Sequence, residues 1–108
     1  LGALGAGDIG KHFPDSDEKF AGIFSITLLE QVVRLTAEKG YVLANADITL
    51  VCQAPRLAPY LEDMKALLGR TCQVDPAVIN IKATTTEGMG FTGRKEGIGC
   101  HAVVLLQA

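Results

Sequence analysis

The first stretch with helical periodicity runs from Ser25 to about Lys39. Ser25 is a suitable helix cap, and Gly40 takes the position that commonly follows the last turn of a helix. Apolar residues recur along this stretch at helical spacing: Ile26, Leu29, Val32 and Val33. The pattern predicts an amphipathic helix with one face directed at a core.

A second helix is predicted after Pro59, because proline suits the first helical turn. Gly69 is expected to end this helix. Its buried stripe consists of Leu61, Met64, Leu67 and Leu68. Asp75 and Pro76 predict one further, isolated helical turn.

Three segments have the pattern of strands. Ala46 to Gln53 alternates between the two faces of a strand and stops before Pro55. Ile79 to Thr84 is the second strand. Gly97 to Gln107 is the third; it is apolar on both faces and is therefore expected to be central or to lie in an interface.

The order α-β-α-β-β predicts an α/β domain with helices on one face of a small mixed sheet. The strand–helix–strand unit should be a right-handed crossover, and the last two strands are expected to pair antiparallel across the loop 85–96. So few elements make a thin domain. Further strands or partner subunits are expected to cover its open surfaces.

Composition narrows the class of protein. The 108 residues suit one domain, and a chain that is 48% hydrophobic and 20% charged is not disordered. A net charge of −2 without a basic stripe argues against nucleic acid as a partner, and no apolar stretch reaches membrane-spanning length. The three separated cysteines, Cys52, Cys72 and Cys100, are expected to be reduced and mostly buried thiols of a cytosolic protein.

The segment from Thr84 to Glu87 is the strongest candidate for chemistry. Three hydroxyls and a carboxylate stand at a strand end, and the glycines that follow let backbone amides approach a phosphate closely. Arg94, in the same glycine-rich loop, can pair with phosphate through two hydrogen bonds. The segment is either a phosphate or metal-diphosphate site or an ordinary polar junction between strand and loop.

Two other segments carry candidate groups. Asp8 to Asp17 reads as a loop with three carboxylates and a histidine; it is a solvated turn, or it binds ligand hydroxyls through its carboxylates and backbone. Cys52 to Arg56 follows a strand and leaves backbone groups free where α/β sheets usually place ligands, or it is a plain strand-to-helix turn.

Together and in this order, the three segments resemble the 2-C-methyl-D-erythritol 2,4-cyclodiphosphate synthase family of the non-mevalonate isoprenoid pathway. The matching stretches are GDIGKHFPDSD, EKGYVLANADITLVCQAPRLAP and INIKATTTEGMGFTGRKEGIGC, which span nearly the whole chain. The resemblance implies a ferredoxin-like layered domain that forms a homotrimer with active sites between subunits. It also implies a lyase that releases cytidine monophosphate (CMP) by intramolecular phosphoryl transfer within 4-diphosphocytidyl-2-C-methyl-D-erythritol 2-phosphate.

By matching position, the resemblance implies a role for each segment. The methylerythritol-phosphate part of the substrate is held by Asp8, Ile9, Gly10, Phe13, Pro14, Asp15, Ser16 and Asp17. The cytidine end is bound by Cys52, Gln53, Ala54, Pro55, Arg56, Leu57 and Ala58, with Arg56 at a position that is usually lysine. The diphosphate is contacted by Thr84, Thr85 and Thr86, with Thr85 as the transition-state stabiliser. Glu87 helps to hold the cation that bridges the diphosphate, and Phe91 and Arg94 line the contact between subunits.

The resemblance further implies a divalent cation, which is Zn, Mg or Mn. The family's principal ligands, an Asp-x-His and a further histidine, have no match here and are expected upstream of Leu1, because Leu1 to Ala6 matches the end of the helix that carries the histidine. Residues 1–108 are therefore expected to be one synthase domain truncated at its N-terminus and inactive on its own. The implied compartment is the bacterial cytoplasm or the plastid stroma. The alternative function is a non-catalytic α/β module that binds a nucleotide or trimerises.

Overall fold

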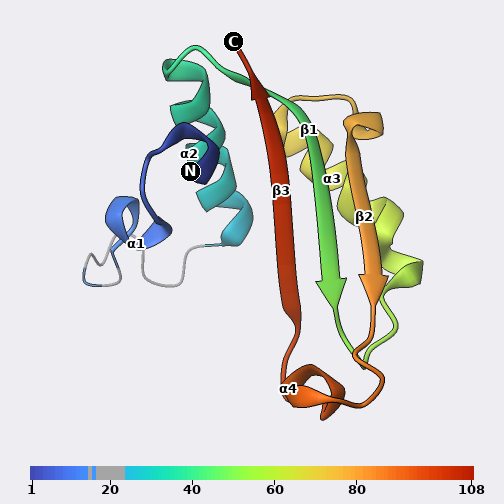
Figure 1. Ribbon diagram of the computed structural model, residues 1–108. Helices are drawn as coiled ribbons and strands as arrows, with labels where there is room; N and C mark the ends of the chain where they lie inside the picture. Colours follow the sequence, from blue (N-terminus) through green and yellow to red (C-terminus); the bar gives the residue numbers. More distant parts are fainter. Residues whose placement is uncertain (15, 17–23) are drawn as a thin grey trace.

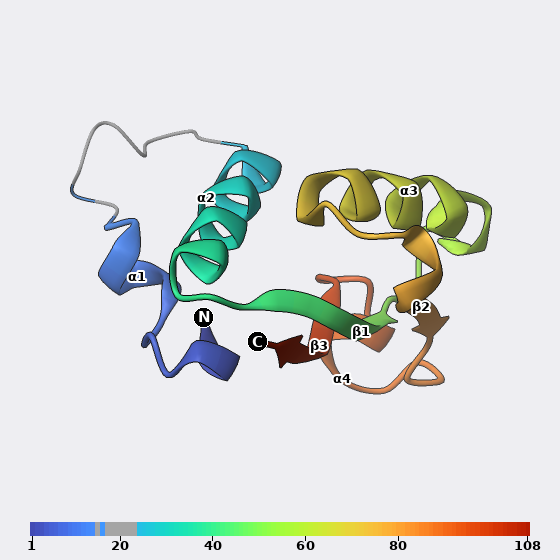
Figure 2. The same cartoon turned by 90° about the horizontal axis from the view of Figure 1, so that it is seen from above.

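The computed structural model describes residues 1–14, 16 and 24–108. Its elements are η1 (Gly2–Leu4), α1 (Ile9–His12), α2 (Ser25–Glu38), β1 (Val42–Val51), η3 (Ala58–Tyr60), α3 (Leu61–Cys72), η4 (Pro76–Val78), β2 (Ile79–Thr84), α4 (Gly90–Gly93) and β3 (Gly99–Gln107). Helices α2 and α3 lie on one face of a three-stranded sheet (Figure 1, and from above in Figure 2). The predicted fold class, with helices on one face of a small mixed sheet, is confirmed.

The strand order is β2-β1-β3, with β1 parallel to β2 and antiparallel to β3. The parallel strand–helix–strand unit was predicted correctly. The prediction that β2 pairs antiparallel with β3 is wrong, because β1 lies between them. The connection 85–98 carries its own helix, α4, and is longer than a hairpin loop of two to five residues, so it takes the chain past β1. β3 therefore lies at an edge of the sheet and is not central.

Strand β1 begins at Val42 rather than Ala46. Its register with β3 shifts between Leu43 and Asn45, which marks a bulge or irregularity. A bulge interrupts the two-residue period on which strand prediction depends. The alternation therefore becomes visible only after the irregularity, and the sequence pattern missed the first part of the strand.

Both main helices differ from prediction at one end. Phe24, and not Ser25, is the N-cap of α2, and Ser25 is its first helical residue. α3 passes through Gly69 and ends at Cys72, where Gln73 takes the left-handed conformation at φ 58°. A β-carbon at Gly69 would lie 2.9 Å from Cγ of Pro76, so this glycine permits close packing and does not stop the helix.

The expected single turn at Pro76 is present as η4. The Asp75 carboxylate accepts a hydrogen bond from the Ala77 amide at 2.9 Å. On the sheet face opposite the helices, Asp47 of β1 pairs with Lys82 of β2 at 2.6 Å and accepts a hydrogen bond from Asn80 at 3.0 Å. The bond from Lys82, followed by that from Asn80, lowers the pKa of the Asp47 carboxyl, which favours its charged state.

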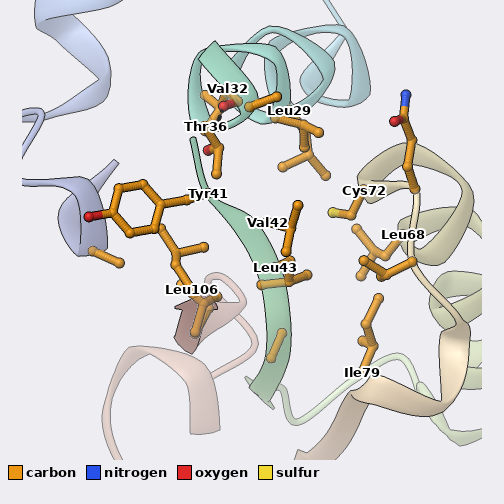
Figure 3. A pocket seen from close by; sticks show the side chains of 18 of the residues that line it. Leu29, Val32, Thr36, Tyr41, Val42, Leu43, Leu68, Cys72, Ile79 and Leu106 are labelled. Atoms are coloured by element: carbon orange, nitrogen blue, oxygen red, sulfur yellow. Dashed lines mark hydrogen bonds between the residues drawn. The ribbon is translucent and has the colours of Figure 1, made fainter. Parts of the chain in front are cut away.

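The described part of the chain has a small core and wide apolar openings. Its buried apolar residues are Ala46, Cys52 and Ile79. An apolar cavity of about 320 Å³ lies between α2, α3 and the sheet, and Leu29, Val32, Leu68 and Leu106 line it (Figure 3). On β3, Val103 is 73% exposed and Leu105 is 59% exposed. The described residues therefore leave apolar surfaces open, and what covers them stays a prediction. None of the helices that the structure describes has the length and apolar character to span a bilayer.

Candidate functional site

Two of the three candidate segments meet at one end of the sheet, where β1 and β2 finish. Cys52 follows β1 and Thr84 ends the parallel strand β2, so both lie at the carboxyl end of the pair, where α/β sheets bind ligands. The Cys52 amide donates a hydrogen bond to the Thr84 carbonyl at 3.0 Å. The Gln53 side-chain carbonyl, Oε1, accepts a hydrogen bond from the Gly88 amide at 3.2 Å. These two bonds join the segment after β1 to the segment after β2.

Thr84 and Thr85 are exposed at this end of the sheet. Thr84 Oγ1 donates to the Thr85 carbonyl at 3.3 Å, and Thr85 Oγ1 accepts from the Glu87 amide at 3.2 Å. An accepting hydroxyl keeps its own proton for another partner. Thr85 can therefore donate to an anion placed outside the loop, and the Glu87 carboxylate is exposed beside it.

The hydroxyl of Thr86 points the other way. It donates to the Met89 carbonyl and lies 3.0 Å from Oγ1 of Thr92 on α4. Thr92 is 5% exposed, which makes it a buried polar side chain within the described residues. The sequence did not single out Thr92, because a threonine between Phe91 and Gly93 in a glycine-rich loop carries no signal of its burial.

The glycines of the loop allow its backbone conformation and its close packing. Gly88 and Gly90 have φ of 82° and 70°, a left-handed backbone that favours glycine. The amide of Gly88 donates to Gln53, and that of Gly93 donates to the Met89 carbonyl at 3.1 Å. A β-carbon at Gly93 would lie 2.2 Å from the carbonyl carbon of Gly88. The amides of Gly88 and Gly93 thus have partners within the chain.

The turn after β1 combines a buried anchor with exposed backbone. The Cys52 thiol can donate a hydrogen bond to either of two carbonyl oxygens, that of Ala54 at 3.0 Å or that of Pro55 at 3.5 Å. Ala54, Pro55, Arg56 and Ala58 are exposed and Leu57 is half-buried. A ligand at this turn would therefore meet exposed residues.

The cysteines are free, but they are not uniformly buried. Cys52 is buried, Cys72 is half-buried and Cys100 is exposed on β3. Burial raises the pKa of the Cys72 thiol and keeps it protonated. The expectation of mostly buried thiols is wrong for Cys100, because β3 is an edge strand.

Arg94 and Phe91 lie at the surface around α4. Arg94 forms a two-pronged ion pair with Glu96, with Nε to Oε1 at 2.7 Å and Nη2 to Oε2 at 3.3 Å. Phe91 is 55% exposed. A phosphate or a partner subunit would therefore meet an arginine that already has a carboxylate partner in this chain.

The helix α1, in the described part of the third segment, lies apart from the other two segments within the chain (Figures 1 and 2). Asp8 caps α1 by accepting from the Lys11 amide at 3.0 Å, and His12 Nε2 donates to the Ala6 carbonyl at 2.6 Å, so the predicted loop contains a helical turn. The helix α1 lies beside α2 and away from α4 in both views (Figures 1 and 2). Of the other predicted site residues here, Ile9, Gly10 and Ser16 are exposed, Phe13 and Pro14 are half-buried, and Asp15 and Asp17 lie outside the described residues.

The described residues lack a cluster of side chains that could bind a metal ion. Residues 1–14, 16 and 24–108 contain no group of three or more His, Cys, Asp or Glu side chains placed to hold a metal ion. These residues do not by themselves form a metal site.

The comparisons with known proteins agree with this geometry. The model of the YgbB family matches residues 1–107, and the chain belongs to this family. It is 60% identical over 107 residues to a protein named bifunctional enzyme IspD/IspF from Desulfotalea psychrophila, covering 99% of this chain and 28% of the relative. It is 56% identical over 107 residues to a 2-C-methyl-D-erythritol 2,4-cyclodiphosphate synthase from Vibrio cholerae, covering 99% of this chain and 68% of the relative.

Solved structures give the same result. The bifunctional IspDF of Campylobacter jejuni superposes with a TM-score of 0.93 at 43% identity, covering 98% of this chain and 29% of that one. A Plasmodium falciparum IspF described as a CDP complex superposes with a TM-score of 0.85 at 31% identity, covering 98% and 63%. The predicted resemblance to the cyclodiphosphate synthase family is confirmed.

Proposed function

We propose that the protein to which these residues belong is a 2-C-methyl-D-erythritol 2,4-cyclodiphosphate synthase. The observation that carries the proposal is the junction of the Cys52–Ala58 turn with the Thr84–Glu87 segment at the carboxyl ends of β1 and β2. One segment offers exposed backbone for a cytidine and the other offers hydroxyls for a diphosphate. A relative described as a CDP complex supports a ligand of this kind.

The proposed reaction asks for positioning and charge stabilisation. An oxygen of the substrate's 2-phosphate attacks the β-phosphorus, the bond from that phosphorus to the bridging oxygen breaks, and the bridging oxygen leaves with CMP. No protein nucleophile and no water molecule takes part. The Thr85 hydroxyl donates a hydrogen bond to a phosphoryl oxygen whose negative charge increases in the transition state.

The separation of α1 from α4 supports an active site shared between subunits. The helices α1 and α4 lie apart in both views, so one chain does not bring the segment around α1 together with the loop that carries α4 (Figures 1 and 2). A second copy can bring its own α1 to the carboxyl ends of β1 and β2. The exposed apolar side chains of β3 provide a surface for such an assembly, which we propose is the homotrimer.

The cation and the compartment remain part of the proposal. Glu87 is the proposed contact to a divalent cation, Zn, Mg or Mn. Because the residues that the structure describes contain no group of three or more side chains placed to hold a metal ion, we expect no CMP release from residues 1–108 alone. The bacterial cytoplasm or the plastid stroma stays the predicted compartment.

Substitution of Thr85 in the full-length protein tests the proposed role of its hydroxyl. Thr85→Val keeps the shape of the side chain and removes the donor, so kcat for CMP release should fall by about 100-fold or more. Thr85→Ser keeps the hydroxyl and should retain most of the activity. Steady-state kinetics of CMP release measure both.

Thr71→Val is the matched control. It also removes one threonine hydroxyl, which donates to the Leu67 carbonyl at 2.8 Å on α3, and it should leave kcat unchanged. Wild-type kcat in Thr85→Val would refute the role of Thr85. A full-length protein that binds CDP tightly and releases no CMP from the substrate would instead be the non-catalytic nucleotide-binding module.

A further inference from the structure

Thr92 is buried inside the loop that follows the diphosphate segment. It lies on α4, is 5% exposed, and its hydroxyl is 3.0 Å from that of Thr86. A buried hydroxyl is costly unless it forms a hydrogen bond, so this contact accounts for a polar residue at that place. None of the predicted contacts with substrate includes Thr92.

The direction of this hydrogen bond follows from counting protons. A threonine hydroxyl has one proton, and that of Thr86 is directed to the Met89 carbonyl. The proton between the two hydroxyls must therefore come from Thr92. Thr92 donates, Thr86 accepts, and the two bonds form a chain that ends on the backbone at Met89.

This chain of bonds fixes the loop next to Thr85. The backbone supports the same closure: the Met89 amide donates to the Thr86 carbonyl at 3.0 Å and the Gly93 amide to the Met89 carbonyl at 3.1 Å. The backbone bonds set the path of the loop. The hydroxyl pair holds the side chain of the residue directly after Thr85.

We propose that Thr92 is a positioning residue, which acts through Thr86 to hold the Thr84–Glu87 segment in the geometry that the phosphoryl transfer requires. The inference rests on the proposed function. It assigns hydrogen-bond donation to the diphosphate to the outward hydroxyl of Thr85, because the Thr84 hydroxyl directs its proton to the Thr85 carbonyl, and it gives the inward hydroxyl of Thr86 a role in holding the loop.

The full-length enzyme with Thr92→Val tests this role. Valine keeps the methyl group of Thr92 and replaces the hydroxyl with a second methyl group, so the loop loses the donor to Thr86 without losing volume. Because small misplacements of reacting groups slow catalysis strongly, kcat for CMP release should fall about tenfold or more. The affinity for CMP, measured by calorimetry, should stay within about twofold, since its proposed site is the Cys52–Ala58 turn.

Three further variants separate positioning from a general loss of stability. Thr92→Ser keeps the donor and loses the methyl group, and it should restore most of kcat. Thr86→Val removes the acceptor of the same bond together with the bond from Thr86 to the Met89 carbonyl. The double variant should be no slower than Thr86→Val, because Thr92 acts through Thr86. Thr71→Val removes a hydroxyl on α3 and should leave kcat unchanged.

Each contrary outcome has a distinct meaning. Wild-type kcat in Thr92→Val, equal loss in Thr92→Ser and Thr92→Val, or additive effects in the double variant would overturn the inference. If Thr92→Val fails to fold, Thr86→Val still reports on the same bond, and wild-type kcat there would overturn it. A wild-type protein that releases no CMP would contradict the proposed function and not this inference.

Discussion

At the scale of single residues, identical amino acids in the loop after β2 have different tasks. Thr85 keeps a proton for a ligand, whereas Thr86 and Thr92 use their hydroxyls on each other and on the backbone. Sequence alone predicts that a cluster of threonines at a strand end can bind phosphate. It cannot tell which hydroxyls face outward, because that depends on the path of the loop.

Gly93 is the residue at which the close packing of this loop can be tested. A β-carbon would lie 2.2 Å from the Gly88 carbonyl carbon, so Gly93→Ala forces the backbone to move. We expect the free energy of unfolding to fall by about 1–3 kcal/mol. Urea denaturation of the full-length protein measures the change.

Gly2→Ala is the control for this prediction. A β-carbon at Gly2 meets no atom within 4 Å, so the free energy of unfolding should change by less than about 0.5 kcal/mol. Equal effects of the two substitutions would show that the contact between Gly93 and Gly88 does not constrain the loop.

At the scale of elements, local patterns located most helices and strands and the parallel β1–β2 unit, and failed on the neighbour of β3. The bounds of β2 were predicted correctly, because its six residues have no bulge and are followed by polar residues. Gly69 shows the limit: a glycine that permits packing against Pro76 looks in sequence like one that ends a helix. The neighbours of β3 are a long-range property, since Val51 and Gly99 pair across many intervening residues.

Strand β3 carries the prediction about assembly. Val104 lines the cavity on the helix side, and Val103 points to the opposite face because side chains alternate along a strand. An aspartate at position 103 places a charge on the proposed interface. Val103→Asp should therefore convert the wild-type assembly to smaller species in analytical ultracentrifugation.

Leu67→Asp makes the same chemical change on α3, where Leu67 is 39% exposed in the helical layer, and it should leave the assembly state unchanged. If Val103→Asp sediments as the wild type does, the open face of the sheet is not the interface.

At the scale of the whole molecule, the candidate site is divided. The turn after β1 and the loop after β2 form one half, and α1 forms another on the far side of α2 (Figure 1). The three motifs, read along the sequence, predicted one site. The structure shows that a single chain holds them in two places, and the proposed homotrimer is the arrangement that reunites them.

The central claim is that the complete protein cyclises its substrate, with the 2-phosphate and not water as the attacking group. The most direct measurement is phosphorus NMR and mass spectrometry of the products formed by the full-length enzyme in water enriched in heavy oxygen. The account predicts CMP and a cyclic diphosphate in equal amounts, with no heavy oxygen in either product. Heavy oxygen in CMP or in the released methylerythritol phosphate would show hydrolysis, and it would contradict the assignment as a cyclodiphosphate synthase.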